Sequence, residues 1–261
     1  MMKNRSSVLI ILVFALMVVA TASTLSVNKF PQPEAQESSP AQQKRTFGKE
    51  EFESQYPIAD VSAAEPTDPA KKAKRKARDK RYNKKSQPPI SEYSSSMVGY
   101  TDWEVGLPAL PVAQSRVVLI GRVKDAQAYV SSNKEAVYSE FTVQLKEALK
   151  KDSGEALSPD AMITVTRGGG RARFPSGHIF LQHIAGQGMP RVGREYVFFL
   201  TRDDEEQDFH IVTAYELRGN DVMPLDFPPD HPMNQYIGAD KDSFMSALRV
   251  ALANPQPAAQ N

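Results

Sequence analysis

From Arg116 to Met223 the chain consists of short β-branched and aromatic runs, each bounded by turn-forming residues. The clearest run places Phe141, Val143 and Leu145 at alternate positions with polar residues between them. A period of two turns one set inward and the other toward water, as in a half-buried strand. Between the runs there is no helical pattern long enough for a parallel crossover. The region therefore predicts a mainly β fold, a small antiparallel barrel or sandwich.

Six or seven strands are expected in this region. They fall at 117–123 with a continuation over 126–130, and at 140–146, 162–166, 178–185, 194–201, 209–215 and 222–223. One helix is expected near the C-terminus, capped by Asp240 or Asp242 and ended by Pro255. Its apolar residues form one stripe at helical spacing: Phe244, Met245, Leu248 and Leu252. We expect this stripe to pack on the barrel, with a free amphipathic membrane helix as the alternative.

Four segments resemble a group of uncharacterised exported bacterial proteins. They read VVLIGRV, YSEFTVQLKEALK, MITVTRGGG and RVGREYVFFL, and the last contains the pattern Val-Gly-x-x-Tyr-Val-x-Phe-Leu. The resemblance covers about residues 105–226 and implies a core similar to small OB-like barrels, including the netrin-type module of protease inhibitors. Netrin-type inhibition involves disulfides and a leading cysteine. This chain contains no cysteine, so that mechanism does not carry over. OB-like barrels often bind oligonucleotides or sugars, but a fold does not determine a function.

The N-terminus has the three parts of a secretory signal peptide. Lys3 and Arg5 precede an unbroken apolar run over residues 8–20, and small residues follow up to Ala22. Two interpretations of residues 1–22 stay open: cleavage after Ala22, or retention as a membrane anchor. Both place the rest of the chain on the far side of the membrane, because the basic residues come first. We therefore expect an exported protein that is periplasmic, secreted or anchored by this segment.

The next segment, residues 23–104, is rich in proline and serine and poor in large aliphatic residues. Such a segment buries too little apolar area to offset its chain entropy, which predicts a disordered linker. Leu107 to Pro111 is expected to run as an extended lead-in along the folded domain. The remaining divisions expected are a β-barrel domain at 105–228, a C-terminal segment with the helix at 229–253, and a disordered tail at 254–261.

The linker contains a basic run from Lys71 to Lys85, with ten basic residues against one acid, Asp79. Good helix formers from Ala70 to Tyr82 predict a frayed helix here. Such a run can contact anionic lipid, acidic envelope polymers or nucleic acid, and the alternative is a solvated spacer. Nucleic acid is disfavoured, because the leader removes the run from most of it. The folded region is also near neutral, with 14 basic and 16 acidic residues over 115–228.

No motif predicts a catalytic residue, a cofactor or a metal. The absence of cysteine excludes disulfides, thiolate metal sites and a cysteine nucleophile. The glycines at 168–170 lack the Lys-Ser or Lys-Thr of a phosphate loop, so tight turns are the better interpretation. The histidines, including His178 and His183, lack metal-ligand spacing, which leaves only a zinc site built from distant partners. The acidic residues at 203–208 predict a solvated hairpin tip, with a weak calcium site as the alternative.

One cluster suggests a binding site. Five arginines flank the two glycine-rich loops, and would form an anion-binding patch if those loops meet: Arg167, Arg171, Arg173, Arg191 and Arg194. Arginine forks suit carboxylates, sulfates and phosphates. Ordinary surface arginines are the alternative interpretation.

These features favour a non-enzymatic extracytoplasmic binding or interaction module. Its partner is expected to be an envelope protein, or an anionic polymer or lipid contacted through Lys71 to Lys85. A more specific alternative is an envelope-tethered polymer or lipid binder that uses the basic run. A second alternative is an extracytoplasmic hydrolase with no recognisable motif.

Overall fold

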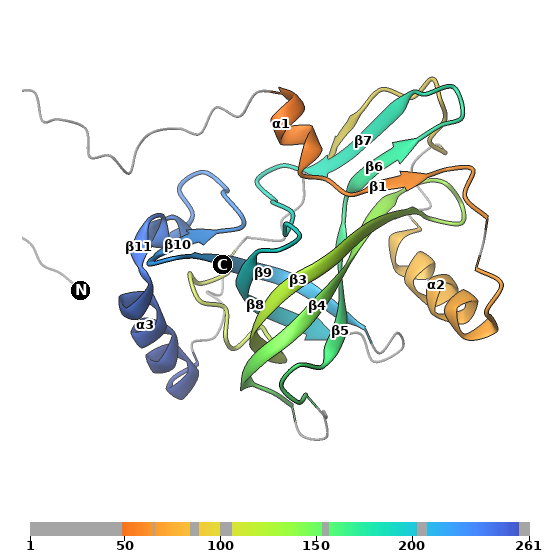
Figure 1. The fold of residues 1–261 in the computed structure, drawn as a ribbon. Helices are drawn as coiled ribbons and strands as arrows, with labels where there is room; N and C mark the ends of the chain where they lie inside the picture. The colour runs from red at the N-terminus through yellow and green to blue at the C-terminus, as the bar shows by residue number, and fades with distance from the viewer. Residues whose placement is uncertain are drawn as a thin grey trace, which may run out of the picture. The chain divides into compact units, whose positions relative to one another are not determined.

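The computed structural model describes most of the chain from residue 49 onward and has a mainly β fold with a C-terminal helix (Figure 1). The described ranges are 49–64, 66–83, 89–99, 106–152, 157–202 and 208–255. The predicted leader at 1–22, the acidic residues at 203–207 and the end of the predicted tail lie outside them. Over these ranges, no helix has the length and apolar character needed to cross a bilayer.

The larger sheet has seven strands and contains almost all of the predicted ones. Its strands are β3 (Val117–Val130), β4 (Val137–Lys150), β5 (Met162–Gly168), β8 (Glu195–Arg202), β9 (Phe209–Arg218), β10 (Asp221–Pro224) and β11 (Ala239–Asp240). Along it, β9 pairs with β5, β5 with β4, β4 with β3, and β3 with β8. An additional pairing joins β8 to β9, so the circuit of hydrogen-bonded strands returns to β9. Only the β5–β9 pair in this circuit is parallel.

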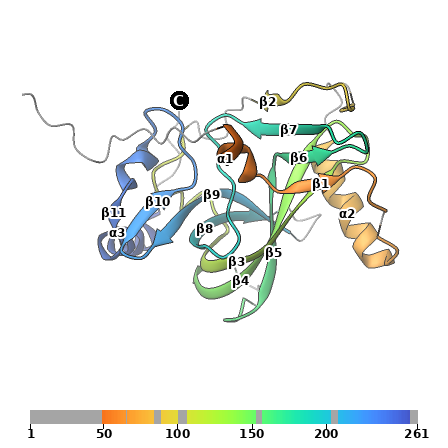
Figure 2. The same cartoon turned by 45° about the horizontal axis from the view of Figure 1, so that its top comes forward.

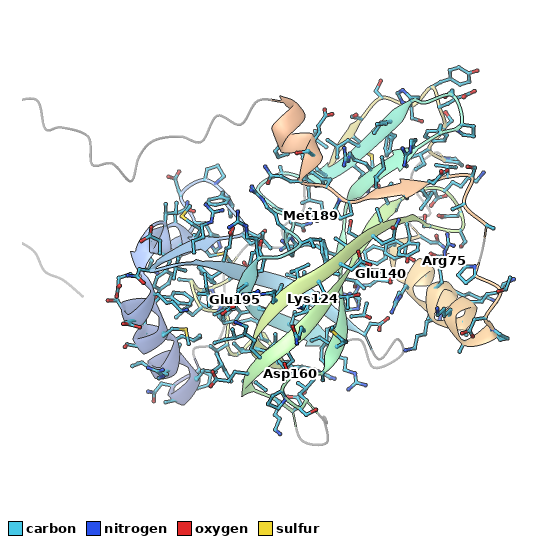
Figure 3. The ribbon with its side chains drawn as sticks, viewed as in Figure 1. Arg75, Lys124, Glu140, Asp160, Met189 and Glu195 are labelled. Atoms are coloured by element: carbon cyan, nitrogen blue, oxygen red, sulfur yellow. The ribbon has the colours of Figure 1, made fainter. Side chains whose placement is uncertain are left out.

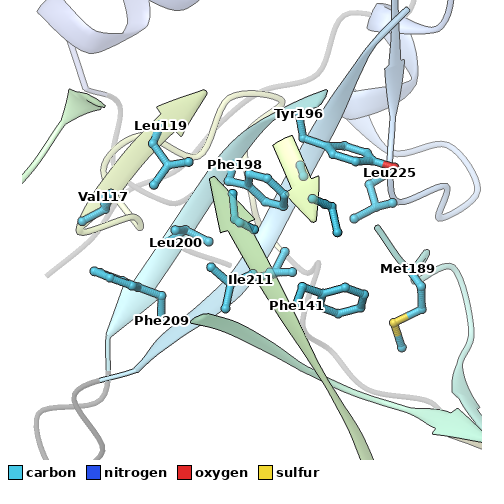
Figure 4. Packing of buried hydrophobic residues seen from close by; sticks show 14 of the residues in the cluster. Val117, Leu119, Phe141, Met189, Tyr196, Phe198, Leu200, Phe209, Ile211 and Leu225 are labelled. Carbon is cyan, nitrogen blue, oxygen red and sulfur yellow. The ribbon is translucent and has the colours of Figure 1, made fainter. Parts of the chain in front are cut away.

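Inside this circuit, alternate residues of the strands form an apolar core (Figure 4). Phe141 and Val143 of β4 and Phe198 and Leu200 of β8 all belong to it, and each has no exposed surface. Their alternate positions in sequence place these side chains on the same face of their strands. The alternation predicted for Phe141 and Val143 is confirmed.

The other face of β8 is also buried, and the C-terminal helix covers it. Helix α3 (Lys241–Ala253) is capped by Asp240, whose side chain accepts a hydrogen bond from the Ser243 amide at 2.9 Å. Phe244 and Leu248 pack in one cluster with Phe199 of β8. The expectation that the helical stripe packs on the β domain is thus confirmed.

A second sheet of four strands lies beside the first. It contains β6 (Gly170–Arg173) and β7 (Ile179–Ile184), flanked by β1 (Ile58–Asp60) and β2 (Met97–Gly99) in the order β1-β6-β7-β2. Strand β6 lies where only a glycine-rich turn was expected. Gly169 has a φ of +101°, and a Cβ there would lie 2.8 Å from Cε of Met189 and 3.0 Å from the Gln182 carbonyl oxygen. Glycine is therefore required at the corner between β5 and β6, as the tight-turn interpretation expects.

The predicted disorder over 23–104 is wrong for several described segments. Besides β1 and β2, this region contains the helices α1 (Lys49–Ser54) and α2 (Pro69–Tyr82). Strand β1 pairs in parallel with β6, and β2 pairs in parallel with β7. Backbone hydrogen bonds hold these edge strands, so their sequences need few large apolar residues. The domain therefore begins well before the predicted boundary at residue 105.

Candidate anion-binding surface on helix α2

The basic run forms a capped helix. The Asp68 side chain accepts a hydrogen bond from the Ala70 amide at 2.8 Å, and Pro69 occupies the first helical position. Both features favour helix initiation, because they satisfy or remove amides that have no partner within the helix. Lys80 and Arg81 lie in the last turn, where cations interact favourably with the helix dipole. The predicted helix at Ala70 to Tyr82 is confirmed, and its first residue is Pro69.

One side of α2 is attached to the β domain through Arg78, which is only 8% exposed. Its Nη1 lies 2.6 Å from Oε2 of Glu140 on β4, and its Nε donates to Oδ2 of Asp208. Asp208 was expected to belong to a solvated acidic turn, and its burial beside Arg78 corrects that expectation. A guanidinium between two carboxylates satisfies charges that would otherwise be costly to bury.

Burial changes the acidity of the carboxylates beneath the helix. It raises the pKa of Glu140, although the Arg78 charge acts in the opposite direction. It also raises the pKa of Asp79, whose Oδ1 accepts a hydrogen bond from the Tyr138 hydroxyl at 3.2 Å. Desolvation is the largest contribution in both cases.

Aromatic rings complete the contact. Tyr82 stacks on Tyr138 with ring centroids 4.6 Å apart and planes 5° from parallel, and its hydroxyl donates to Oγ1 of Thr166 at 3.2 Å. The Arg75 guanidinium lies 5.3 Å from the ring centroid of Tyr129. Figure 3 shows Arg75 on α2 and Glu140 on the neighbouring strand. These polar and aromatic contacts orient the helix without a large aliphatic side chain from α2.

The rest of the surface of α2 is cationic, and we call it the α2 cationic face. Its six members are exposed: Lys71, Lys72, Lys74, Lys76, Lys80 and Arg81. Lys72, Lys76 and Lys80 are spaced by four residues and so share one row, which spans about 12 Å at 1.5 Å per residue. Like charges at this spacing weaken an isolated helix slightly. The contacts of the attached side counteract this, and they keep the face in one orientation.

Of the five arginines predicted to form an anion-binding patch, Arg167 is buried in an ion pair. Its two Nη atoms each lie 2.8 Å from an oxygen of Asp226. The same carboxylate accepts hydrogen bonds from the Thr213 hydroxyl at 2.8 Å and the Gly188 amide at 2.9 Å. This arrangement connects β5 and β9 to the loops around them. Its role is structural, and it does not present Arg167 to a ligand.

The other arginines of that set contact different parts of the domain. Nε of Arg171 donates to the Tyr56 carbonyl at 2.9 Å, and Arg173 lies opposite Asp60 in the β1–β6 register. Nε of Arg194 lies 3.7 Å from Oε1 of Glu216. The Arg191 amide donates to the Tyr196 hydroxyl at 2.9 Å. The side chains of Arg171 and Arg194 therefore have partners elsewhere in the chain.

The histidines do not assemble with acids into a metal site in the part of the chain that the structure describes. Nδ1 of His210 lies 2.6 Å from Oγ1 of Thr166. His183 packs edge-on against the rings of Phe52 and Tyr56, and burial lowers its pKa. His178 Nε2 lies 3.1 Å from the Ser94 carbonyl oxygen.

A cavity of about 270 Å³ lies beside the C-terminal end of α2, between Arg81, Tyr82 and strands β5, β7 and β9. Polar groups in its wall are bonded to one another. Nε2 of Gln187 donates to the Gly168 carbonyl at 2.9 Å, and the Val137 amide donates to Oε1 of Gln182 at 2.7 Å. These contacts hold the wall in place, so the α2 cationic face remains the better candidate for ligand contact.

The chain matches no known protein-family model and no curated protein. The function therefore has to be argued from the chain's own residues. Sequence reasoning found the cations of α2 but not the residues that attach the helix. Arg78 and Asp79 resemble the charged residues around them, and no spacing rule connects them to Glu140, Tyr138 or Asp208.

Proposed function

We propose that this protein is a non-enzymatic interaction module that presents the α2 cationic face to an anionic phospholipid surface. The observation that carries the proposal is the two-sided character of α2. One side is attached to the β domain through Arg78, Asp79 and Tyr82, and the remaining surface of the helix exposes six cations. Attachment orients the charges, which reduces the conformational entropy lost when a ligand binds.

The chemistry of the exposed side favours an electrostatic contact. A basic residue near an anionic bilayer contributes about 1 kcal/mol, and the attraction decays within a Debye length. Between the cations, the exposed side carries small residues such as Ala70 and Ala73. Such a face would lie at the headgroups without inserting apolar side chains.

The sequence favours a bilayer over other polyanions. The apolar run at 8–20 predicts export, and its retention would place an anchor in the membrane. Ala20 and Pro69 are 49 positions apart (69 − 20). A chain segment of that length would keep α2 close to the bilayer from which it emerges.

We further propose that the domain supporting α2 is an OB-like barrel, as the resemblance implies. The circuit of pairings through β3, β4, β5, β9 and β8 supports this proposal. Buried ionic groups near α2 are used in internal contacts such as Arg167–Asp226 and Arg78–Glu140. Because these charged groups pair with one another, they favour a domain that supports a binding surface over a domain that contains a catalytic centre.

A site-specific label tests the lipid proposal, since the chain contains no cysteine. Ala73→Cys on α2 would carry a fluorophore, and Val250→Cys on α3, which is 64% exposed, would be the matched control. Vesicles of phosphatidylcholine, with or without phosphatidylglycerol, would contain a lipid with a headgroup quencher. Each variant reports the position of its own helix, so insertion of the apolar N-terminus does not obscure the result.

We expect quenching at the α2 label only with phosphatidylglycerol, and a decrease as salt is raised. The combined change Lys72→Glu, Lys76→Glu and Lys80→Glu should abolish it. Equal quenching with phosphatidylcholine alone, or no response to the triple change, would overturn the proposal. Retention on an anionic polymer without lipid-dependent quenching would also overturn it, and would assign the face to a polymer.

A further inference from the structure

A second surface lies at the outer edge of strand β2. This strand ends the four-stranded sheet, and within the described residues no strand pairs with its other side (Figure 2). The register pairs Gly99 with Ile184, and the Gly99 carbonyl accepts a hydrogen bond from the Ala185 amide at 2.9 Å. Gly99 therefore bonds inward, toward β7. Backbone groups alternate along a strand, so the N–H and C=O of Val98 face the open edge.

A pocket of about 370 Å³ lies beside this edge. Its apolar lining includes Ile90, Met97 and Phe180, and Val98 at the edge is 44% exposed. Ile90 is held in place because its amide donates to the Lys134 carbonyl at 2.6 Å. The hydrogen bond between Ile90 and Lys134 therefore holds both the pocket lining and the segment that leads to β2.

Glu135 adds a charge to the pocket wall. Its Oε2 is buried and receives no hydrogen bond in the structure. Glu135 as a whole is only partly buried, so an N–H donor of a ligand in the pocket can approach its carboxylate. A cationic donor would bind it best, because charge-assisted hydrogen bonds are the stronger kind.

We infer that the β2 edge and this pocket bind an extended peptide that carries a basic residue. The peptide would add as a further strand, with its backbone bonded to the N–H and C=O of Val98. Its apolar side chain would enter the pocket beside Phe180, and its ammonium or guanidinium group would meet the carboxylate of Glu135. Backbone pairing supplies affinity in this mode of recognition, and the side-chain contacts supply specificity. The site is separate from the α2 cationic face and does not depend on the function proposed for it.

Fluorescence anisotropy with two labelled peptides tests the inference on the full chain. One probe is Thr-Val-Lys-Val-Thr, and the matched probe has Glu in place of Lys. We expect the Lys probe to bind about tenfold more tightly, as one charge-assisted contact implies. Glu135→Gln should reduce that preference. Val98→Pro should weaken both probes by about tenfold, because it removes the outward N–H.

Val98→Thr provides the control, since it keeps the N–H and changes only the side chain. A thermal midpoint of Val98→Pro close to that of the unsubstituted chain would show that the variant is folded. If folded Val98→Pro binds both probes as tightly as the unsubstituted chain, strand addition is refuted. If the Lys and Glu probes bind equally well, the role of Glu135 is refuted. Absence of binding to the unsubstituted chain would overturn the whole inference.

Discussion

The core of the strand circuit and the contact beneath α2 hold the same domain by different means. The core consists of apolar side chains such as Phe141 and Phe198, which have no exposed surface. The α2 contact consists of ion pairs, a tyrosine stack and hydrogen bonds. Apolar burial is non-directional and tolerates imprecise placement, whereas charged groups are stabilising only when each has its partner. The two regions should therefore respond differently to substitution, pH and salt.

The largest effect is expected in the core. Phe198→Ala should lower the free energy of unfolding by about 3–5 kcal/mol, because it removes apolar burial and leaves a cavity. Urea denaturation measures this change. A loss below about 1 kcal/mol would show that Phe198 does not fill the core and that the strand register is wrong.

A smaller and more local loss is expected beneath α2. Arg78→Ala should destabilise the attached helix by about 3 kcal/mol, because Glu140 and Asp208 would remain buried without their cation. Hydrogen exchange of the α2 amides would report this as faster opening of the helix. Arg75→Ala is the control on the same helix and should cost about 0.5–1 kcal/mol, since it removes a cation–π contact and weaker charge interactions with Asp79 and Glu140. If both substitutions destabilise the helix equally, Arg78 is not the residue that attaches it to the β domain.

The two regions should also differ in how their contributions to stability depend on pH. Burial raises the pKa of Glu140 and Asp79 in the folded chain, so the folded state holds these protons more tightly than the unfolded state. Their contribution to the free energy of unfolding should therefore increase as pH falls from neutral toward the ordinary carboxyl range. Denaturation of the Glu140→Gln variant over this range should show a shallower dependence. The apolar core residues contribute no such pH dependence. If the free energy of unfolding of Glu140→Gln depends on pH as steeply as that of the unsubstituted chain, Glu140 is not the source of the dependence.

The smallest effect is expected on the α2 cationic face. Lys76→Ala should change stability by no more than about 0.5 kcal/mol, because the side chain is exposed and a like-charge row is relieved. The same denaturation assay measures it beside Arg78→Ala. A loss of stability comparable with that of Arg78→Ala would mean that the face contributes to the fold. This would weaken the proposal that the face binds a ligand.

Local pattern was sufficient for most strands. Phe141, Val143 and Leu145 could be assigned to one face because alternation is a property of neighbouring residues. The helix at 241–253 was predictable for the same reason, from the spacing of Phe244 and Leu248 and the cap at Asp240. Strand β6 was missed because Gly170–Arg173 has the composition of a turn and is held by pairing with β1 and β7.

The candidate sites were less predictable. Composition identified the cations from Lys71 onward, but it also predicted disorder there, since hydropathy does not register ion pairs or tyrosine stacking. The burial of Arg167 was not predictable, because its ion-pair partner Asp226 lies 59 positions away. The edge of β2 and the pocket beside it had no sequence signal, because three residues of strand are too few to produce a pattern.

The sequence by itself determined which residues alternate, where the chain turns, and that a dense basic run lies before the β region. Each of these depends on neighbours along the chain. Only the tertiary structure decided that this helical run is attached through Arg78 to Asp208, 130 positions away, and which of its charges face outward. The physical reason is that a charged side chain has no preferred partner until the fold brings a complementary group within a few ångströms.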